Sequence, residues 1–161
     1  MNGSDARRIR IIGAALDLGQ DRRGVDMGPS AMRSANLQGQ LEALGFDVHD
    51  DGNIVAPDMA ALEQGDPRAK YLADILRYNA RMADAVEAAT RAGEFPLVLG
   101  GDHSLAIGVL GGLARAAGAP GAVLWIDAHG DLNTPDTSPS GNIHGMPVAA
   151  GRARPHVVRH R

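Results

Sequence analysis

The chain has 161 residues, of which 44% are hydrophobic, 3% aromatic and 22% charged, and its formal net charge is -3. This composition predicts one soluble globular domain with an aliphatic core and excludes a disordered chain. The sequence has no cysteine, which excludes disulfides, cysteine-zinc sites and thiol nucleophiles. Because it has neither a basic stripe nor an apolar run of about 20 residues, we expect no nucleic-acid partner, no membrane partner and a cytoplasmic location.

Four short apolar runs are expected to form buried strands, at residues 9–14, 46–49, 96–99 and 122–126. Longer segments with helical spacing separate them. Strands that alternate with helices are typical of βαβ units, in which the strands lie parallel to one another. The sequence therefore predicts an α/β fold with a parallel sheet.

Three helices are predicted between these strands. The first covers residues 28–44, with a proline in its first turn and a glycine directly after its last residue. The second covers residues 68–92, where apolar side chains recur at steps of three and four residues. The third covers residues 104–117 and contains three glycines, which lower its helix propensity.

The strongest chemical signal follows the fourth predicted strand. Asp127, His129 and Asp131 stand at a spacing of two directly after the apolar run 122–126. In an extended backbone alternate side chains point to one face, so two carboxylates and an imidazole could converge there. Such oxygen and nitrogen donors suit divalent metals. The alternative is a solvated polar strand end, which fits poorly with the buried character of the preceding run.

A second signal, Gly-Gly-Asp-His-Ser at residues 100–104, follows the third predicted strand. Because neighbouring parallel strands lie about 4.8 Å apart, His103 could reach the same metal cluster as Asp127. The alternative is a phosphate-binding loop at a helix N-terminus, with His103 incidental. Together with Asp127, His129 and Asp131, the motif favours a metal site.

The third signal is a polar loop over residues 133–147, which carries hydroxyls, amides and His144. Such groups could bind a polar substrate. His144 could transfer protons, because the pKa of histidine ordinarily lies near neutrality. The alternative is an ordinary capped turn.

Taken together, the segments GGDHS, DAHGD and NTPDTSPSGNIHGMP resemble arginases of the bacterial type, within the ureohydrolase superfamily. The resemblance covers about residues 9–150 and corresponds to the N-terminal half of that family. It implies a three-layer α/β/α fold around a parallel sheet, of the arginase/deacetylase type and truncated in this chain. It also implies a homo-oligomer, a trimer or hexamer, in the full-length family.

The resemblance further implies hydrolysis of L-arginine to L-ornithine and urea by a hydroxide that two manganese ions (Mn2+) activate. The implied metal ligands are His103, Asp127, His129 and Asp131, with Asp127 bridging both ions. Catalytic roles fall to His144, as a proton shuttle, and to Asp131. The residues implied to bind the substrate are His129, Asn133, Ser140 and Asn142.

The later half of the family has no counterpart in this sequence. That half supplies an Asp-x-Asp pair that completes both metals and a carboxylate that binds the guanidinium group. We therefore expect residues 1–150 to be an incomplete arginase-like α/β domain with impaired activity. The alternatives are another ureohydrolase, such as an agmatinase or guanidinobutyrase, and a non-catalytic arginase-like fragment. The loop SGNIHGMP favours arginase over the former.

The last eleven residues, 151–161, read GRARPHVVRHR and contain four arginines and no acidic residue. We interpret them as a basic tail that is not homologous to the family. Of the 16 Lys and Arg residues in the chain only Lys70 is a lysine, which is typical of a GC-rich gene. A frameshift in such a gene would explain the tail, and a genuine basic tail is the alternative.

Overall fold

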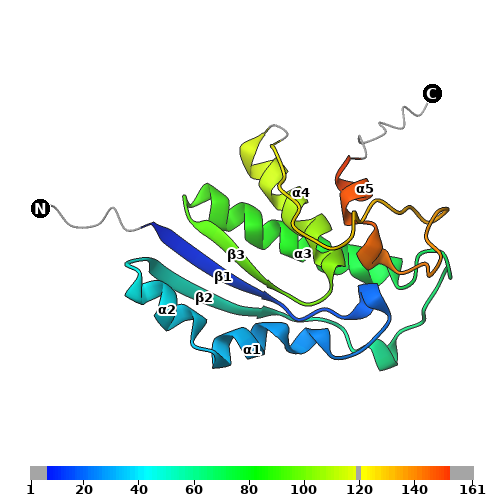
Figure 1. Cartoon of the computed structure of the whole chain (residues 1–161), viewed down its shortest axis with the longest axis horizontal. Coiled ribbons are helices and arrows are strands. Elements are labelled where there is room, and N and C mark those ends of the chain that lie inside the picture. Colours follow the sequence, from blue (N-terminus) through cyan, green and yellow to red (C-terminus); the bar gives the residue numbers. More distant parts are fainter. Residues whose placement is uncertain (1–6, 119–120, 153–161) are drawn as a thin grey trace, which may run out of the picture.

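The computed structural model describes residues 7–118 and 121–152, and in them three parallel strands form one sheet in the order β2-β1-β3. The strands are β1 (Arg8–Ala14), β2 (Asp47–Ile54) and β3 (Phe95–Gly100). Helices α1 (Gly28–Ser34) and α2 (Leu37–Ala43) lie on one face, and α3 (Leu72–Arg91) and α4 (Ala106–Ala117) lie on the other (Figure 1). These three layers confirm the predicted α/β fold with a parallel sheet.

Buried apolar side chains of the central strand β1 pack into a hydrophobic cluster on each face of the sheet. On one face Ile12 packs with Ile75, Met82 and other buried residues of α3. On the other face Ile11 packs with Leu99 of β3 and with residues of α2. A strand that is covered on both faces needs a nearly continuous apolar sequence, which explains the run IIGA at the end of β1.

The first and third predicted strands, at 9–14 and 96–99, are confirmed to within one residue. The second starts at Asp47 and continues to Ile54, beyond the apolar residues that predicted it. Its polar second half is held by arginines from neighbouring elements: Arg33 of α1 bonds Asp50, and Arg10 of β1 pairs with Asp51. Charge pairing therefore extends β2 where the hydrophobic pattern stops.

The fourth predicted strand, at 122–126, is wrong, because residues 121–130 form neither helix nor strand. A strand requires a hydrogen-bonded neighbour, and β3 pairs with β1 but with no other strand among the described residues. The apolar composition of residues 122–126 favours an extended backbone, but a strand also needs a neighbouring strand to pair with.

Two predicted helices differ from those observed. The helix predicted at 28–44 is divided into α1 and α2, because Asn36 adopts a left-handed conformation with φ 58° and ψ 39°. The helix predicted at 68–92 begins at Leu72, after Tyr71, which is also left-handed with φ 54°. Asparagine tolerates this conformation better than most residues, but the periodicity that predicted one helix does not register it.

The third predicted helix, at 104–117, comprises a 3-10 turn, η4 (His103–Leu105), followed by α4. Gly108 and Gly112 are buried where α4 packs on α3, and a Cβ at either would collide with the α3 backbone. These glycines therefore allow the close approach of two helices at the expense of helix propensity.

The remaining elements are short. They are the 3-10 turns η1 (Leu18–Gln20), η2 (Val25–Met27), η3 (Met59–Ala61) and η5 (Ile143–Gly145), and the helix α5 (Pro147–Arg152). α5 runs across the predicted domain boundary at 150, and the rest of the predicted basic tail, residues 153–161, lies outside the described residues. Across the described ranges, every helix is too short or too polar to span a membrane.

Candidate active site

The residues predicted for the site line one open pocket of about 580 Å³. Its lining residues come from η4, which follows the carboxyl end of β3, and from the long loop that precedes α5. Parallel α/β proteins ordinarily place their sites at this end of the strands. The predicted residues in the wall of the pocket are His103, Asp127, His129, Asp131, Asn133, Ser140, Asn142 and His144.

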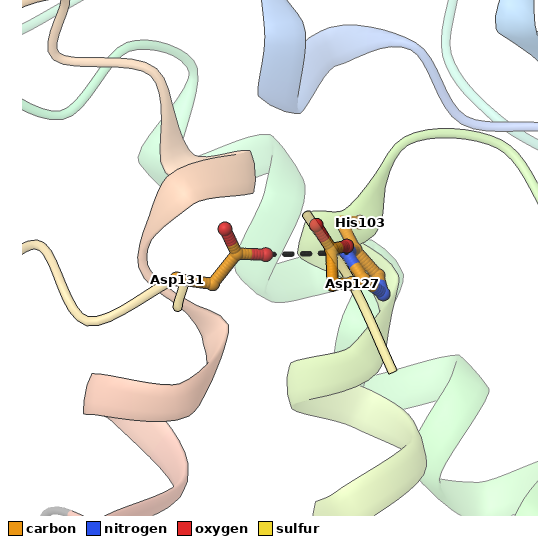
Figure 2. A group of neighbouring side chains, drawn as sticks. All are labelled: His103, Asp127 and Asp131. Carbon is orange, nitrogen blue, oxygen red and sulfur yellow. Dashed lines mark ion pairs between the residues drawn. The ribbon is translucent and has the colours of Figure 1, made fainter. Parts of the chain in front are cut away.

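Three of these side chains point toward one another (Figure 2). The Nδ1 atom of His103 lies 2.9 Å from Asp127 Oδ2 and 3.1 Å from Asp131 Oδ2. One ligand atom from each residue can be chosen so that all lie within 4.8 Å of one another. Two carboxylate oxygens and one imidazole nitrogen around a common point fit a divalent cation. We name His103, Asp127 and Asp131 the triad cluster.

The backbone brings the triad cluster together by bends, and the extended geometry predicted for residues 127–131 is wrong. Residues 127–129 form a bend, and Asp131 has a left-handed φ of 46°. The carbonyl oxygen of Asp131 accepts hydrogen bonds from the N–H groups of Val148 (3.0 Å) and Ala149 (3.3 Å), which fix it against α5. Convergence therefore depends on this tertiary anchor and not on strand alternation.

His129 lies beside the triad cluster without joining it. Its side chain is 82% exposed, and its Nδ1 lies 3.3 Å from Asp127 Oδ1. The backbone N–H of His129 donates to the same Asp127 oxygen at 2.8 Å. The predicted role of His129 as a metal ligand stays a prediction.

The surroundings of the triad cluster favour the ionised form of Asp127 and restrict the ring of His103. The N–H of His129 donates to Asp127, and this bond, together with the nearby imidazole of His103, holds the pKa of Asp127 below its ordinary value. An ionised carboxylate is the form that binds a cation. The ring of His103 stacks on Trp125, with centroids 4.5 Å apart, which restricts the orientation of the imidazole.

Asp102 is a site-supporting residue that the sequence interpretation missed. It is buried, and its two carboxylate oxygens accept hydrogen bonds from the N–H groups of Ser104 and Gly19, both at 2.8 Å. Burial raises the pKa of Asp102, although these hydrogen bonds oppose the shift. Aspartate before a helical turn is a typical N-cap, and this signal could have identified it. Asp102 therefore joins the turn that carries His103 to the loop after β1.

The loop from Asn133 to His144 forms the opposite wall of the pocket. The N–H of Asn133 donates to Gly145 O (3.1 Å), and the side-chain amide of Asn142 donates to Gln20 O (2.9 Å). Ser140 Oγ accepts from the N–H of Asn142 at 3.2 Å. The side-chain nitrogen of Asn142 is thus engaged in holding the loop to η1, whereas its buried Oδ1 has no hydrogen-bond partner among the described residues.

Comparison with known proteins gives consistent matches to arginases. The family model described as "Arginase family" matches residues 7–160. The arginase of Bacillus caldovelox is 55% identical over 143 residues, which cover 88% of this chain and 48% of that protein. The solved structure of the Bacillus caldovelox arginase superposes with a TM-score of 0.81 at 52% identity, covering 89% of this chain and 48% of that one.

A more distant match is the arginase of Entamoeba histolytica, solved in complex with L-ornithine, with a TM-score of 0.80 and 32% identity. That match covers 91% of this chain and 50% of the other. The chain thus spans about half the length of the relatives that it matches.

Proposed function

The chain belongs to the arginase family, and from this premise we propose that its pocket serves arginase-type hydrolysis of L-arginine to L-ornithine and urea. One observation supports this proposal most strongly. His103, Asp127 and Asp131 come from two separate segments of the chain and converge beyond the carboxyl end of β3. The loop SGNIHGMP, which favours arginase over agmatinase, forms the wall facing them.

We propose that the triad cluster binds manganese, with His129 as a further ligand. The donors are mostly carboxylate oxygens, which suit Mn2+ better than a structural zinc site. When two such ions are bound, they supply the Lewis acidity that makes water a nucleophile at neutral pH. Asp127 lies between His103 and His129, which makes it the proposed bridging ligand.

The other pocket residues are proposed to act on the substrate itself. Asn133, Ser140 and Asn142 present amide and hydroxyl groups for the charged amino-acid end of arginine. His144 in η5, half-buried at the same wall, is the proposed proton shuttle. Family membership also supports a cytoplasmic homo-oligomer, a trimer or hexamer, whose size sedimentation velocity would measure.

Activity of the 161-residue chain itself is expected to be low. Within residues 7–118 and 121–152, three residues converge as donors, whereas Mn2+ prefers six oxygen or nitrogen ligands. Each ion would therefore be undercoordinated, and both metal affinity and water activation should fall. We expect little or no urea release with saturating manganese. Turnover near that of the Bacillus caldovelox arginase, assayed in parallel, would contradict this expectation.

Metal binding by the chain distinguishes an impaired arginase from a fragment without a metal site. Titration with Mn2+, followed by electron paramagnetic resonance, should show weak binding that Asp131→Asn abolishes. The matched control is Asp136→Asn in the same loop, whose 83% exposed side chain lies outside the triad cluster and should leave binding unchanged. Any residual urea release should favour arginine over agmatine, and the reverse preference would indicate another ureohydrolase.

A further inference from the structure

The chain has a single tryptophan, and that residue lies directly beside the triad cluster. The indole of Trp125 stacks on the imidazole of His103, with the ring centroids 4.5 Å apart and the ring planes inclined by 23°. A centroid distance of this size is at the short end of the range for stacked aromatic rings, so the two faces are in direct contact. One candidate metal ligand is therefore backed by a flat aromatic surface.

The stack also joins the two segments that carry the triad cluster. His103 belongs to η4, whereas Trp125 stands two residues before Asp127. Residues 121–126 make no backbone–backbone hydrogen bond with the rest of the described chain. The side chains at positions 124 and 126 are 86% and 88% exposed, whereas that of Trp125 is half-buried. Within this segment, the indole therefore makes the contact that holds the chain against η4.

The ring of His103 has polar contacts on one side only. Within the described part of the chain, its contacts with Asp127 and Asp131 both involve Nδ1, and its side chain is 41% exposed. A histidine that binds a metal through one ring nitrogen is usually oriented by a hydrogen bond at the other. In His103 the indole face lies where such a bond would otherwise act, and it restricts rotation of the imidazole.

The contacts of Trp125 itself are apolar. Its Nε1 atom is buried and has no hydrogen-bond partner within the described residues, although a buried indole N–H usually finds one. Trp125 and His103 line one groove together with Ala106 and Leu110 of α4. The position therefore uses the aromatic face of the tryptophan and not its polar edge.

We propose that Trp125 is a positioning residue of the metal site, whose indole holds the imidazole of His103 with Nδ1 turned toward Asp127 and Asp131 (Figure 2). Without the indole, the exposed imidazole would rotate among several orientations and would have to be ordered when a cation binds. That ordering has an entropic cost, which lowers the affinity for the cation. The inference deepens the proposed manganese site and rests on it.

Proton NMR of the metal-free chain tests the orientation of His103 directly. The ring current of a stacked indole shifts the carbon-bound protons of the imidazole upfield, and His103→Gln identifies those signals by their loss. We expect upfield signals that Trp125→Leu returns to their ordinary positions and that Trp125→Phe shifts less. Ordinary positions for the His103 signals in the unsubstituted chain would overturn the proposal.

Titration with Mn2+, followed by electron paramagnetic resonance, tests the consequence for the metal site. Trp125→Leu should weaken binding about tenfold, as loss of a contact that orients a ligand ordinarily does. Trp125→Phe keeps an aromatic face and should stay within roughly threefold of the unsubstituted chain. The matched control, Leu124→Ala, alters the neighbouring side chain and should leave the affinity unchanged. With folding verified by circular dichroism, equal affinities for Trp125→Leu and the unsubstituted chain, or equal losses for Trp125→Leu and Trp125→Phe, would overturn the proposal.

The fluorescence of Trp125 provides a third measurement. A paramagnetic Mn2+ ion bound beside His103 should quench it, with the same midpoint as in the resonance titration. Saturable Mn2+ binding that leaves the fluorescence unchanged would place the ion away from the stack and overturn the proposal. If the unsubstituted chain binds no Mn2+, the proposed manganese site is contradicted, and the NMR comparison still decides whether Trp125 orients His103.

Discussion

The buried carboxylate of Asp102 links two segments that are distant in the sequence. One of its oxygens accepts from Ser104 N in η4, and the other accepts from Gly19 N in the loop after β1. The N–H of Asp102 in turn donates to Leu16 O at 2.8 Å. Hydrogen bonds to a buried charged group are stronger than neutral ones, so this residue holds the turn of His103 against the core.

Replacing Asp102 by alanine should destabilise the chain by about 2–3 kcal/mol, because two buried N–H groups lose their acceptor. Asp102→Asn should cost less, since its one remaining oxygen still accepts a hydrogen bond. Urea denaturation followed by circular dichroism measures both. As a control, Asp84→Ala removes a 70% exposed carboxylate paired with Arg115 and should change stability by less than about 1 kcal/mol. Equal losses for Asp102→Ala and Asp84→Ala would show that the buried contacts are not stabilising.

The residues proposed from the sequence motifs line one pocket, but the sequence did not predict how three of their side chains converge. His103, Asp127 and Asp131 were found from short motifs, because metal-binding side chains at strand ends have recognisable spacing. Their convergence depends on the left-handed Asp131 and on its hydrogen bonds to α5, which are tertiary features. Trp125, which stacks on His103, was assigned only to a strand, because its packing partner lies 22 residues away in the chain.

Among helices and strands, prediction succeeded where local and tertiary preferences agree. β1 and β3 are apolar runs with paired neighbours, and both were located to within one residue. The split between α1 and α2 was missed because it depends on one backbone conformation, at Asn36. The strand predicted at 122–126 is not formed, because its apolar composition indicates an extended backbone but no strand pairs with this segment among the described residues. Strand propensity therefore predicted a strand correctly only where a neighbouring strand was present to pair with it.

The contact between α1 and β2 provides a pH-dependent test. Arg33 donates from Nε and Nη2 to the two oxygens of Asp50, both at 2.7 Å. This pairing, aided by the N–H of Gly52, holds the pKa of Asp50 below its ordinary value. The folded state thus binds the proton less readily than the unfolded chain. The stabilisation is present above the unfolded pKa of about 3.9 and is lost as pH falls through the folded value.

Asp50→Asn should therefore cost about 1 kcal/mol at pH 7, and the difference from the unsubstituted chain should shrink between pH 5 and pH 3. Urea midpoints measured at several pH values give this difference. Asp47→Asn in the same strand, which removes an exposed carboxylate, is the control and should keep the acid-dependent fall in stability. A constant difference for Asp50→Asn across this range would show that the ion pair does not couple folding to protonation.

At the scale of the whole molecule, the buried core lies on the side of the pocket formed by the sheet and α3. β1, α3 and the residues that join them form the larger core, with Ile12, Ile75 and Val86 almost fully buried. The segment that carries Asp127 and His129 is exposed and outside regular structure. The triad cluster therefore combines a histidine held against the core with a carboxylate on a weakly anchored segment. A bound cation would order that segment most.

Native-state hydrogen exchange should reveal this division directly. The amides of β1 are hydrogen-bonded between two strands and should exchange only on global unfolding, with a strong dependence on urea concentration. The amides of residues 121–126 make no backbone–backbone hydrogen bond with described residues and should exchange at nearly unprotected rates, independent of urea. Exchange of α5, whose first turn is bonded to Asp131, should lie between these limits. Slow exchange at 121–126 would mean that this segment is already hydrogen-bonded in solution, which would contradict the proposed division.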